Sequence, residues 1–222
     1  MNPRTERRFV PGPAGDIECA IDAPAGTPLG SAVICHPHPV HGGTLDNKVV
    51  QTLARACVAL GWRSVRFNFR GVGGSMGQWD EGVGEIDDAL AVIAALRDPA
   101  LPWLLAGFSF GGFVAASAAQ RLAGPTGTPG TPGTTGPARL VLVGPSTQKQ
   151  QLPAVAPDTI VIHGELDEVV PLAATLDWAR PQSLPVIVFP GVGHFFHGQL
   201  ALLKSVVMQH LQAPAIPQST NP

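Results

Sequence analysis

Short apolar runs recur along the chain and alternate with segments in which apolar residues appear at every third or fourth position. The runs predict buried strands at residues 31–36, 63–69, 101–106, 140–143, 159–162 and 186–189. The spaced segments predict amphipathic helices at residues 46–60, 86–96, 110–122 and 200–211. Because continuously apolar strands separated by helices need cover on both faces, the pattern predicts an α/β fold with a mostly parallel sheet.

Two details refine the ends of this pattern. Asp46 precedes the first helical segment as a plausible N-cap, and Gly61 marks its end. Before the first clear strand, Ile17, Cys19 and Ile21 alternate with polar residues, which is typical of a half-buried strand. We therefore expect one or two antiparallel strands at that edge of the sheet.

The length of 222 residues suits one domain, which we place at residues 1–212. From residue 124 to 136 a glycine occurs at every third position, with threonine and proline between. This tract is too short for a collagen-like helix and too polar for a core, so we expect a flexible loop at 124–137. Residues 213–222 carry three prolines and are expected to form a disordered tail.

Charge and cysteine content exclude several classes of protein. The net charge is −2, with no basic stripe of the kind that nucleic acid binding requires. No apolar run is long enough for a membrane span, and residues 1–4 do not begin a secretory signal. The three cysteines are too few for a disulfide framework. We expect a cytoplasmic protein.

The segment from Gly107 to Gly111 carries the first candidate for catalysis, with Ser109 at its centre. It matches the G-x-S-x-G nucleophile elbow, and it follows a predicted strand and opens a predicted helix, as the elbow requires. Glycines are needed there because the strand and helix backbones converge. The pattern therefore predicts that Ser109 is a nucleophile at the carboxyl end of the sheet.

A serine nucleophile needs a base and a carboxylate that orients it, and the chain offers both in the order Ser, Asp, His. Asp167 and His194 each follow a predicted strand, so all three side chains belong to one edge of the sheet. Neighbouring residues are weaker candidates, which we expect to be solvated loop charges, a surface or pocket-rim residue, and a satisfied, partly buried histidine. They are Glu165, Glu168, His197 and His163.

Residues 35–43 follow the first clear strand, where a donor to an oxyanion is expected. Proline has no N–H group, so Pro37 and Pro39 cannot serve. We expect the backbone N–H groups of His38 and Phe110 to form the oxyanion hole. His36 is expected to brace the loop through hydrogen bonds.

A zinc site is the competing interpretation of the same loop. His36, His38 and His41 resemble the H-x-H-x-D-H signature of zinc-dependent hydrolases, but Val40 replaces the aspartate. A dinucleotide loop at residues 71–76 has Met76 in place of the third glycine, and no P-loop is present. We therefore expect no metal and no cofactor.

Taken together, these motifs resemble the α/β-hydrolase superfamily, in particular the small proteins related to dienelactone hydrolases and short carboxylesterases. The resemblance implies an eight-stranded, mostly parallel sheet and no cofactor. True dienelactone hydrolases use cysteine where this chain has Ser109. Besides the triad candidates, the stretches that carry the resemblance are residues 36–43, 47–50, 66–71 and 194–197.

Many members of the superfamily carry a helical lid, for which the 144–158 segment is too short. We expect an open site that is shaped by the loops around Val40, Met76, Trp79, Phe110 and Phe195. Of these residues, we expect Val40, Met76, Trp79 and Phe195 to bind the substrate. The expected function is cleavage of carboxylic esters or thioesters of small to medium acyl groups, through an acyl-enzyme on Ser109. The alternative is a non-catalytic protein of the same fold that binds a ligand or partner.

Overall fold

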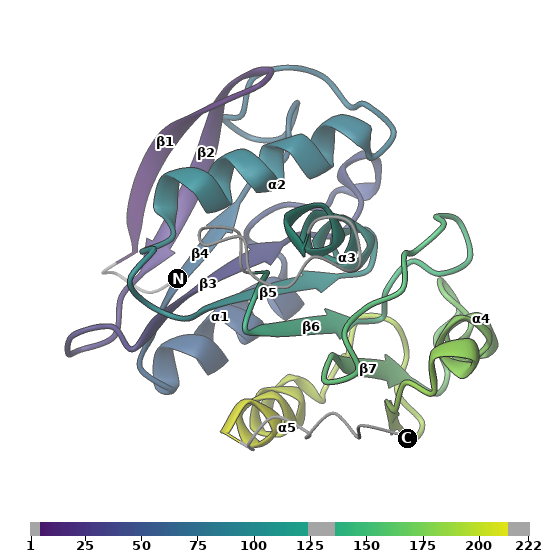
Figure 1. Cartoon of the computed structure of the whole chain (residues 1–222). Coiled ribbons are helices and arrows are strands. Elements are labelled where there is room, and N and C mark those ends of the chain that lie inside the picture. Colours follow the sequence, from purple (N-terminus) through teal and green to yellow (C-terminus); the bar gives the residue numbers. More distant parts are fainter. Residues whose placement is uncertain (1–4, 124–135, 213–222) are drawn as a thin grey trace, which may run out of the picture.

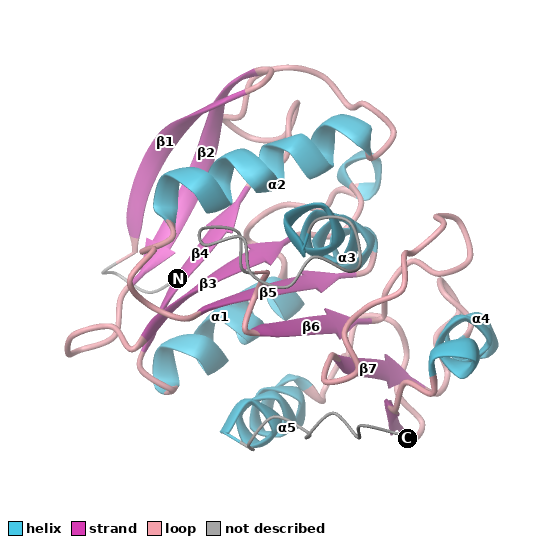
Figure 2. Cartoon of the chain, viewed as in Figure 1, coloured by secondary structure: helices cyan, strands magenta, loops and turns pink. Residues whose placement is uncertain are grey.

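An eight-stranded sheet in the order β1-β2-β4-β3-β5-β6-β7-β8 runs through the protein, with helices on both faces (Figures 1 and 2). The computed structural model describes residues 5–123 and 136–212. The strands are β1 (Glu6–Gly12), β2 (Gly15–Asp22), β3 (Gly30–Cys35), β4 (Trp62–Phe67), β5 (Trp103–Phe108), β6 (Arg139–Val143), β7 (Ile160–Gly164) and β8 (Val186–Phe189). The helices are α1 (Lys48–Ala59), α2 (Val83–Leu96), α3 (Phe110–Ala123), α4 (Leu172–Ala179) and α5 (Leu200–Gln212), with 3-10 turns η1 (Pro39–His41) and η2 (Arg180–Gln182).

Strand direction follows the sequence pattern. The six strands from β3 to β8 run parallel to one another. Strands β1 and β2 form an antiparallel hairpin, and β2 also pairs antiparallel with β4. Every residue of β3 and of β5 is buried, because helices cover both faces of the sheet at its centre. The predicted α/β fold and the predicted antiparallel edge are both confirmed.

Two apolar cores lie on opposite faces of the sheet. Val33 and Leu105 point into the core formed with α2 and α3. Ile34, Leu104 and Ala106 point into the core formed with α1 and α5. This alternation follows from the two-residue period of a strand. The central strands are therefore held from both sides, and the loops at their carboxyl ends start from rigid positions.

The predicted N-cap of α1 was wrong by one residue. Asn47 caps the helix, because its Oδ1 accepts hydrogen bonds from the N–H groups of Val49 and Val50. Asp46 instead pairs with Arg66 at 3.1 Å and with Arg7 at 3.0 Å. Its carboxylate is committed to these partners, and the neighbouring asparagine takes the capping role.

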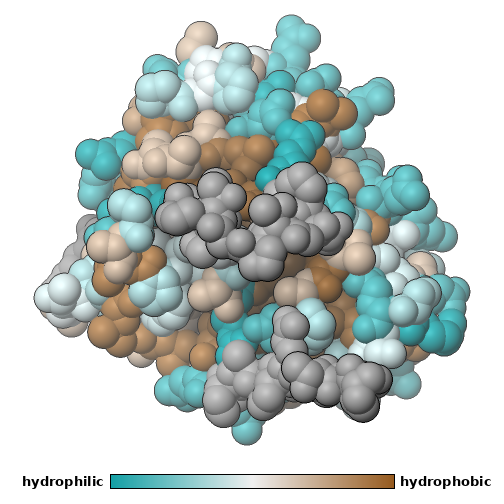
Figure 3. All heavy atoms as spheres, viewed as in Figure 1, coloured by the Kyte–Doolittle hydropathy of each residue, from teal (hydrophilic) through white to brown (hydrophobic). Residues whose placement is uncertain are grey.

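Some expectations fall outside the described part of the chain, namely most of the 124–137 loop and the whole 213–222 tail. Cys19, Cys35 and Cys57 are buried free thiols, as expected of small apolar core residues. Within the described ranges, no helix has the length and apolar character that crossing a membrane requires. On the face shown in Figure 3, polar residues are spread between apolar ones.

Candidate active site

Ser109 occupies the sharp turn between β5 and α3. Its φ of 56° lies in the left-handed region, which costs a non-glycine residue on the order of 1–3 kcal/mol. Three hydrogen bonds hold the turn: the Ser109 N–H donates to the carbonyl of Val143 at 2.9 Å, and the Ser109 carbonyl accepts from Gly112 at 2.9 Å and Ser146 at 3.1 Å. The serine is thus fixed where β5 and β6 end.

The glycines on either side permit the close approach that the sequence predicted. A Cβ on Gly107 would lie 2.0 Å from the carbonyl oxygen of Gly111. A Cβ on Gly111 would lie 2.3 Å from the carbonyl oxygen of Cys35 and 2.4 Å from that of His36. Both contacts are with backbone atoms, so neither is relieved by a side-chain rotation.

Gly111→Ala is therefore expected to lower the free energy of unfolding by about 1–3 kcal/mol or more, because the new methyl group forces the β3 and α3 backbones apart. Urea denaturation of the purified variant measures the loss. The matched control is Gly26→Ala, where a Cβ meets nothing within 4 Å. Equal effects of the two substitutions would show that the close approach at Gly111 is not needed.

Asp167 and His194 come together from the loops that follow β7 and β8. Oδ2 of Asp167 lies 2.6 Å from Nδ1 of His194, and both side chains are buried. The other carboxylate oxygen accepts from the N–H groups of Val169 at 2.9 Å and Val170 at 2.7 Å. Because an ionised carboxylate only accepts, Nδ1 of His194 carries a proton, and in the neutral ring Nε2 then has a lone pair.

The charge state of Asp167 is set by two opposing effects. Burial alone would raise the pKa of this carboxyl group. The hydrogen bonds from His194 and Val170, together with the nearby imidazoles, outweigh burial and hold the pKa below its usual value. Asp167 is therefore ionised at neutral pH, as the partner of an imidazole base must be.

The imidazole of His194 lies beside the serine turn. Its ring centroid is 4.9 Å from that of Phe108, the residue directly before Ser109. A Cβ on Gly144, at the end of β6, would lie 3.4 Å from the same imidazole. The structure thus brings the three predicted residues to one edge of the sheet, over the ends of β5 and β6.

The loop after β3 is closed tightly around His38. The His38 carbonyl accepts from the N–H groups of His41 at 3.1 Å and Gly43 at 3.0 Å, and a Cβ on Gly43 would lie 2.0 Å from the carbonyl oxygen of Pro37. No hydrogen bond between described residues has the backbone N–H of His38 or Phe110 as its donor. Both predicted oxyanion donors are therefore available to a ligand.

His36 braces this loop, as expected. Its Nε2 accepts from the N–H of Phe69 at 3.1 Å, so the proton is on Nδ1, which donates to the carbonyl of Pro37 at 2.6 Å. Burial lowers the pKa of His36 to about 3, in spite of the bond to Pro37, which acts in the opposite direction. The ring is neutral and links the loop after β3 to the loop after β4.

This buried histidine predicts how stability depends on pH. The pKa of His36 is about 3 in the folded protein and 6.5 in the unfolded chain, so only the unfolded state takes up a proton between these values. The free energy of unfolding is therefore expected to fall as the pH drops below about 6.5, by up to about 1.4 kcal/mol per pH unit from this group. His36→Gln should show a shallower fall in urea titrations across that range, and an unchanged slope would contradict the assignment.

Trp79, a predicted substrate contact, forms an aromatic cluster with the side chains of His38 and Phe110 at the oxyanion loop. The His38 ring lies 4.6 Å from Trp79 and 5.1 Å from Phe110, and Trp79 lies 5.1 Å from Phe110. Phe195 is 46% exposed, and its ring lies 5.1 Å from that of His194. The cluster thus lies at the oxyanion loop, and Phe195 lies beside His194.

The remaining two predicted contacts differ from each other. Val40 is exposed in η1, and its N–H donates to Nδ1 of His38, so it belongs to the oxyanion loop. Met76 lies in the loop between β4 and α2, where its N–H donates to the carbonyl of Asp16 and its side chain stands against Gly15. These contacts hold Met76 against the start of β2.

Among the weaker candidates, Glu165 accepts from the N–H of Gly191 at 2.7 Å and so braces a loop. His197 is exposed, as expected. His163 is fully buried rather than partly buried: its Nε2 lies 2.8 Å from the carbonyl of Val170, and its Nδ1 has no partner among the described residues. The expectation of a satisfied histidine was therefore wrong for one of its two ring nitrogens.

Sequence reasoning missed residues 144–150, which follow β6 at the same edge of the sheet. Ser146 holds the serine turn through its N–H group, and its hydroxyl bonds to Gln150. Burial, and to a lesser degree the electrostatic influence of His41 and Lys149, lower the pKa of His38. The available signal was that this segment follows a predicted strand. None of its residue types, however, indicated a role in the site.

The zinc interpretation finds no geometric support. Both ring nitrogens of His36 are already used in hydrogen bonds inside the protein. In residues 5–123 and 136–212, no three His, Cys, Asp or Glu side chains are placed to hold a metal ion.

No protein-family model matches the chain, but individual proteins of known sequence or structure are similar to it. An uncharacterized protein of Rickettsia prowazekii is 40% identical over 116 residues, which cover 51% of this chain and 49% of the relative. The match thus spans about half the length of that curated relative.

Two solved structures match nearly the whole chain. An α/β serine hydrolase homologue from Coxiella burnetii is 38% identical with a TM-score of 0.79, covering 93% of this chain and 97% of the other. A serine hydrolase without a lid from Xanthomonas campestris is 34% identical with a TM-score of 0.83, covering 98% and 99%. In this chain too, no helix lies between β6 and β7, where a lid would be inserted. The chain therefore belongs to the α/β serine hydrolases that lack a lid.

Proposed function

We propose that the protein cleaves carboxylic esters or thioesters of small to medium acyl groups through an acyl-enzyme on Ser109. The observation that carries this proposal is the buried pair of Asp167 and His194, with Oδ2 and Nδ1 2.6 Å apart, beside the turn that holds Ser109 at positive φ. A neutral imidazole with its proton on Nδ1 presents a basic Nε2, which is what a serine hydroxyl needs to become nucleophilic.

The reaction proceeds in two steps. Nε2 of His194 takes the proton of Ser109 as Oγ attacks the substrate carbonyl, and the N–H groups of His38 and Phe110 bind the oxyanion. The imidazolium, stabilised by Asp167, then protonates the leaving alcohol or thiol, and the ester bond to Ser109 forms. Water next attacks this acyl group and gives a proton to Nε2. The imidazolium then protonates Oγ of Ser109 as the bond between Oγ and the acyl group breaks, and the acid is released.

The residues around the site favour an apolar acyl group of small to medium size. Val40 and Phe195 are 65% and 46% exposed, and Trp79 lies against His38 of the oxyanion loop. Without a lid, nothing in the described structure encloses a long chain. We expect kcat/KM to peak at a short acyl chain, in a series of p-nitrophenyl esters and matching thioesters, and to decline for long chains.

A fluorophosphonate probe tests the catalytic assignment. We expect stoichiometric labelling of Ser109 in the folded protein, because the probe reacts only with a serine that an adjacent base activates. His194→Ala should abolish labelling, whereas His197→Ala, at an exposed histidine three residues away, should leave it intact.

The second candidate function is a binding role without catalysis. A folded protein whose Ser109 takes no label would favour that role and would contradict the proposal. Equal labelling of the His194→Ala variant would likewise contradict His194 as the base.

A further inference from the structure

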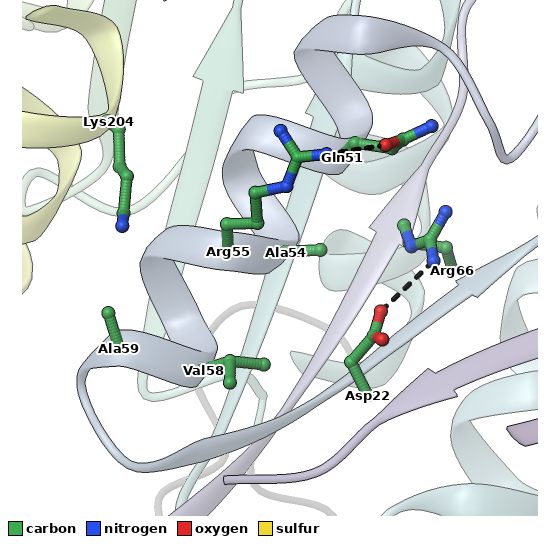
Figure 4. Close-up of a pocket in the computed structure, with 8 residues that line it drawn as sticks. All are labelled: Asp22, Gln51, Ala54, Arg55, Val58, Ala59, Arg66 and Lys204. Carbon is green, nitrogen blue, oxygen red and sulfur yellow. Dashed lines mark hydrogen bonds and ion pairs between the residues drawn. The ribbon is translucent and has the colours of Figure 1, made fainter. Parts of the chain in front are cut away.

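A second pocket, of about 250 Å³, lies between α1, α5 and the strands β2 and β4. It shares no lining residue with the candidate active site. Asp22 pairs with Ser64 near the start of β4, whereas Ser109 follows the carboxyl end of the parallel strand β5. The lining residues are Asp22, Gln51, Ala54, Arg55, Val58, Ala59, Arg66 and Lys204 (Figure 4).

The positive charges of this pocket are only partly neutralised. Arg66 pairs with Asp22 at 3.0 Å and with Asp46 at 3.1 Å. Arg55 donates only to the neutral Gln51, and Lys204 forms no hydrogen bond or ion pair with any described residue. The segments outside the described ranges contain no aspartate or glutamate. Two cations at this pocket therefore lack a side-chain counter-charge.

A buried donor in the same pocket also lacks an acceptor. The Arg66 side chain is 4% exposed, and its Nε has no hydrogen-bond partner among the described residues. A buried donor attached to a charge is destabilising when it is unpaired, so the structure favours an incoming oxygen atom here. This observation is independent of the charges of Arg55 and Lys204.

The lining of this pocket also includes apolar side chains, which the ligand must match. Figure 4 shows Lys204 on α5 at one side, Asp22 and Arg66 on strands at the other, and α1 between them. Ala54, Val58 and Ala59 of α1 supply apolar surface along the same pocket. A ligand that fits must combine negative charge with a short aliphatic part.

We propose that this pocket binds a small organic dianion, namely a phosphate monoester with a short alkyl group. Its two negative charges match Arg55 and Lys204, and its oxygens supply acceptors for guanidinium and ammonium donors. The alkyl group lies against Ala54 and Val58. The pocket is a ligand site separate from the site of acyl transfer.

Isothermal titration of the full chain with butyl phosphate, inorganic phosphate and butyrate tests the proposal. We expect saturable binding of butyl phosphate, with inorganic phosphate and butyrate each weaker by about tenfold, because each lacks one feature that the pocket recognises. The Arg55→Gln/Lys204→Gln variant should bind butyl phosphate at least about tenfold more weakly, since both unpaired charges are removed.

Arg121→Gln is the matched control, because it removes an exposed cation from α3 on the opposite face of the sheet. It should bind butyl phosphate as the unchanged protein does. Esterase activity should be the same in all three proteins, which reports that each is folded. No binding at about 10 mM butyl phosphate, equal affinity of the double variant, or equal affinity for inorganic phosphate would each overturn the proposal.

Discussion

Replacing Ser109 with alanine is expected to lower kcat for ester hydrolysis by about 10⁴- to 10⁶-fold, because the residues of a triad act as one unit. The substitution removes one oxygen atom from a residue that is 7% exposed. It leaves unchanged the three backbone hydrogen bonds that hold the turn. The loss should therefore appear in chemistry and not in folding.

Initial rates with p-nitrophenyl butyrate measure this effect, and circular dichroism with thermal unfolding reports on the fold. Ser205→Ala makes the same chemical change at an exposed position of α5 and should retain full activity. A folded Ser109→Ala protein with more than about one tenth of the original kcat would rule out Ser109 as the nucleophile.

Asp167→Asn is expected to lower kcat by about 10⁴-fold, the size of the effect of the equivalent change in a serine protease triad. Asparagine can still accept from Val169 and Val170 through its carbonyl oxygen. Its amide group then donates to Nδ1 of His194, so the imidazole proton moves to Nε2. In that tautomer His194 cannot take the proton of Ser109.

Glu165→Gln is the matched control for this prediction. The residue lies two positions away, and its carboxylate accepts a backbone N–H from Gly191, which glutamine can also do. We expect its kcat to change by less than about tenfold, since it does not contact His194. Comparable losses in Asp167→Asn and Glu165→Gln would show that Asp167 has no special role in orienting the base.

The serine turn was predictable because its signals are local. Gly107 and Gly111 flank Ser109 within five positions, directly after an apolar run. Asp167 and His194 were predictable for a related reason: each follows a predicted strand, and parallel strands end at the same edge of a sheet. The sequence therefore indicated which side chains meet without giving any distance between them.

Features that depend on distant partners were not predictable in the same way. Asp46 is not the helix cap, because its carboxylate pairs with Arg7 and Arg66, which are 39 and 20 positions away. Met76, in the loop after β4, is held against the start of β2 because its N–H donates to the carbonyl of Asp16, 60 positions earlier. No local pattern encodes such contacts.

The second pocket was even less predictable from the sequence. Its charged residues come from β2, α1, β4 and α5, which are scattered over most of the chain. Each charge taken alone is typical of a solvated helix or strand. Only the folding of α5 against α1 brings Lys204 and Arg55 to one pocket.

Trapping the acyl-enzyme tests catalysis through Ser109 most directly. The protein is mixed with excess p-nitrophenyl butyrate, quenched in acid within the first turnovers, and analysed by intact and peptide mass spectrometry. We predict a mass increase of one butyryl group on the peptide that contains Ser109, and none in Ser109→Ala. A butyryl group on another residue, or turnover of the ester with no adduct on a rapid quench, would contradict catalysis through Ser109.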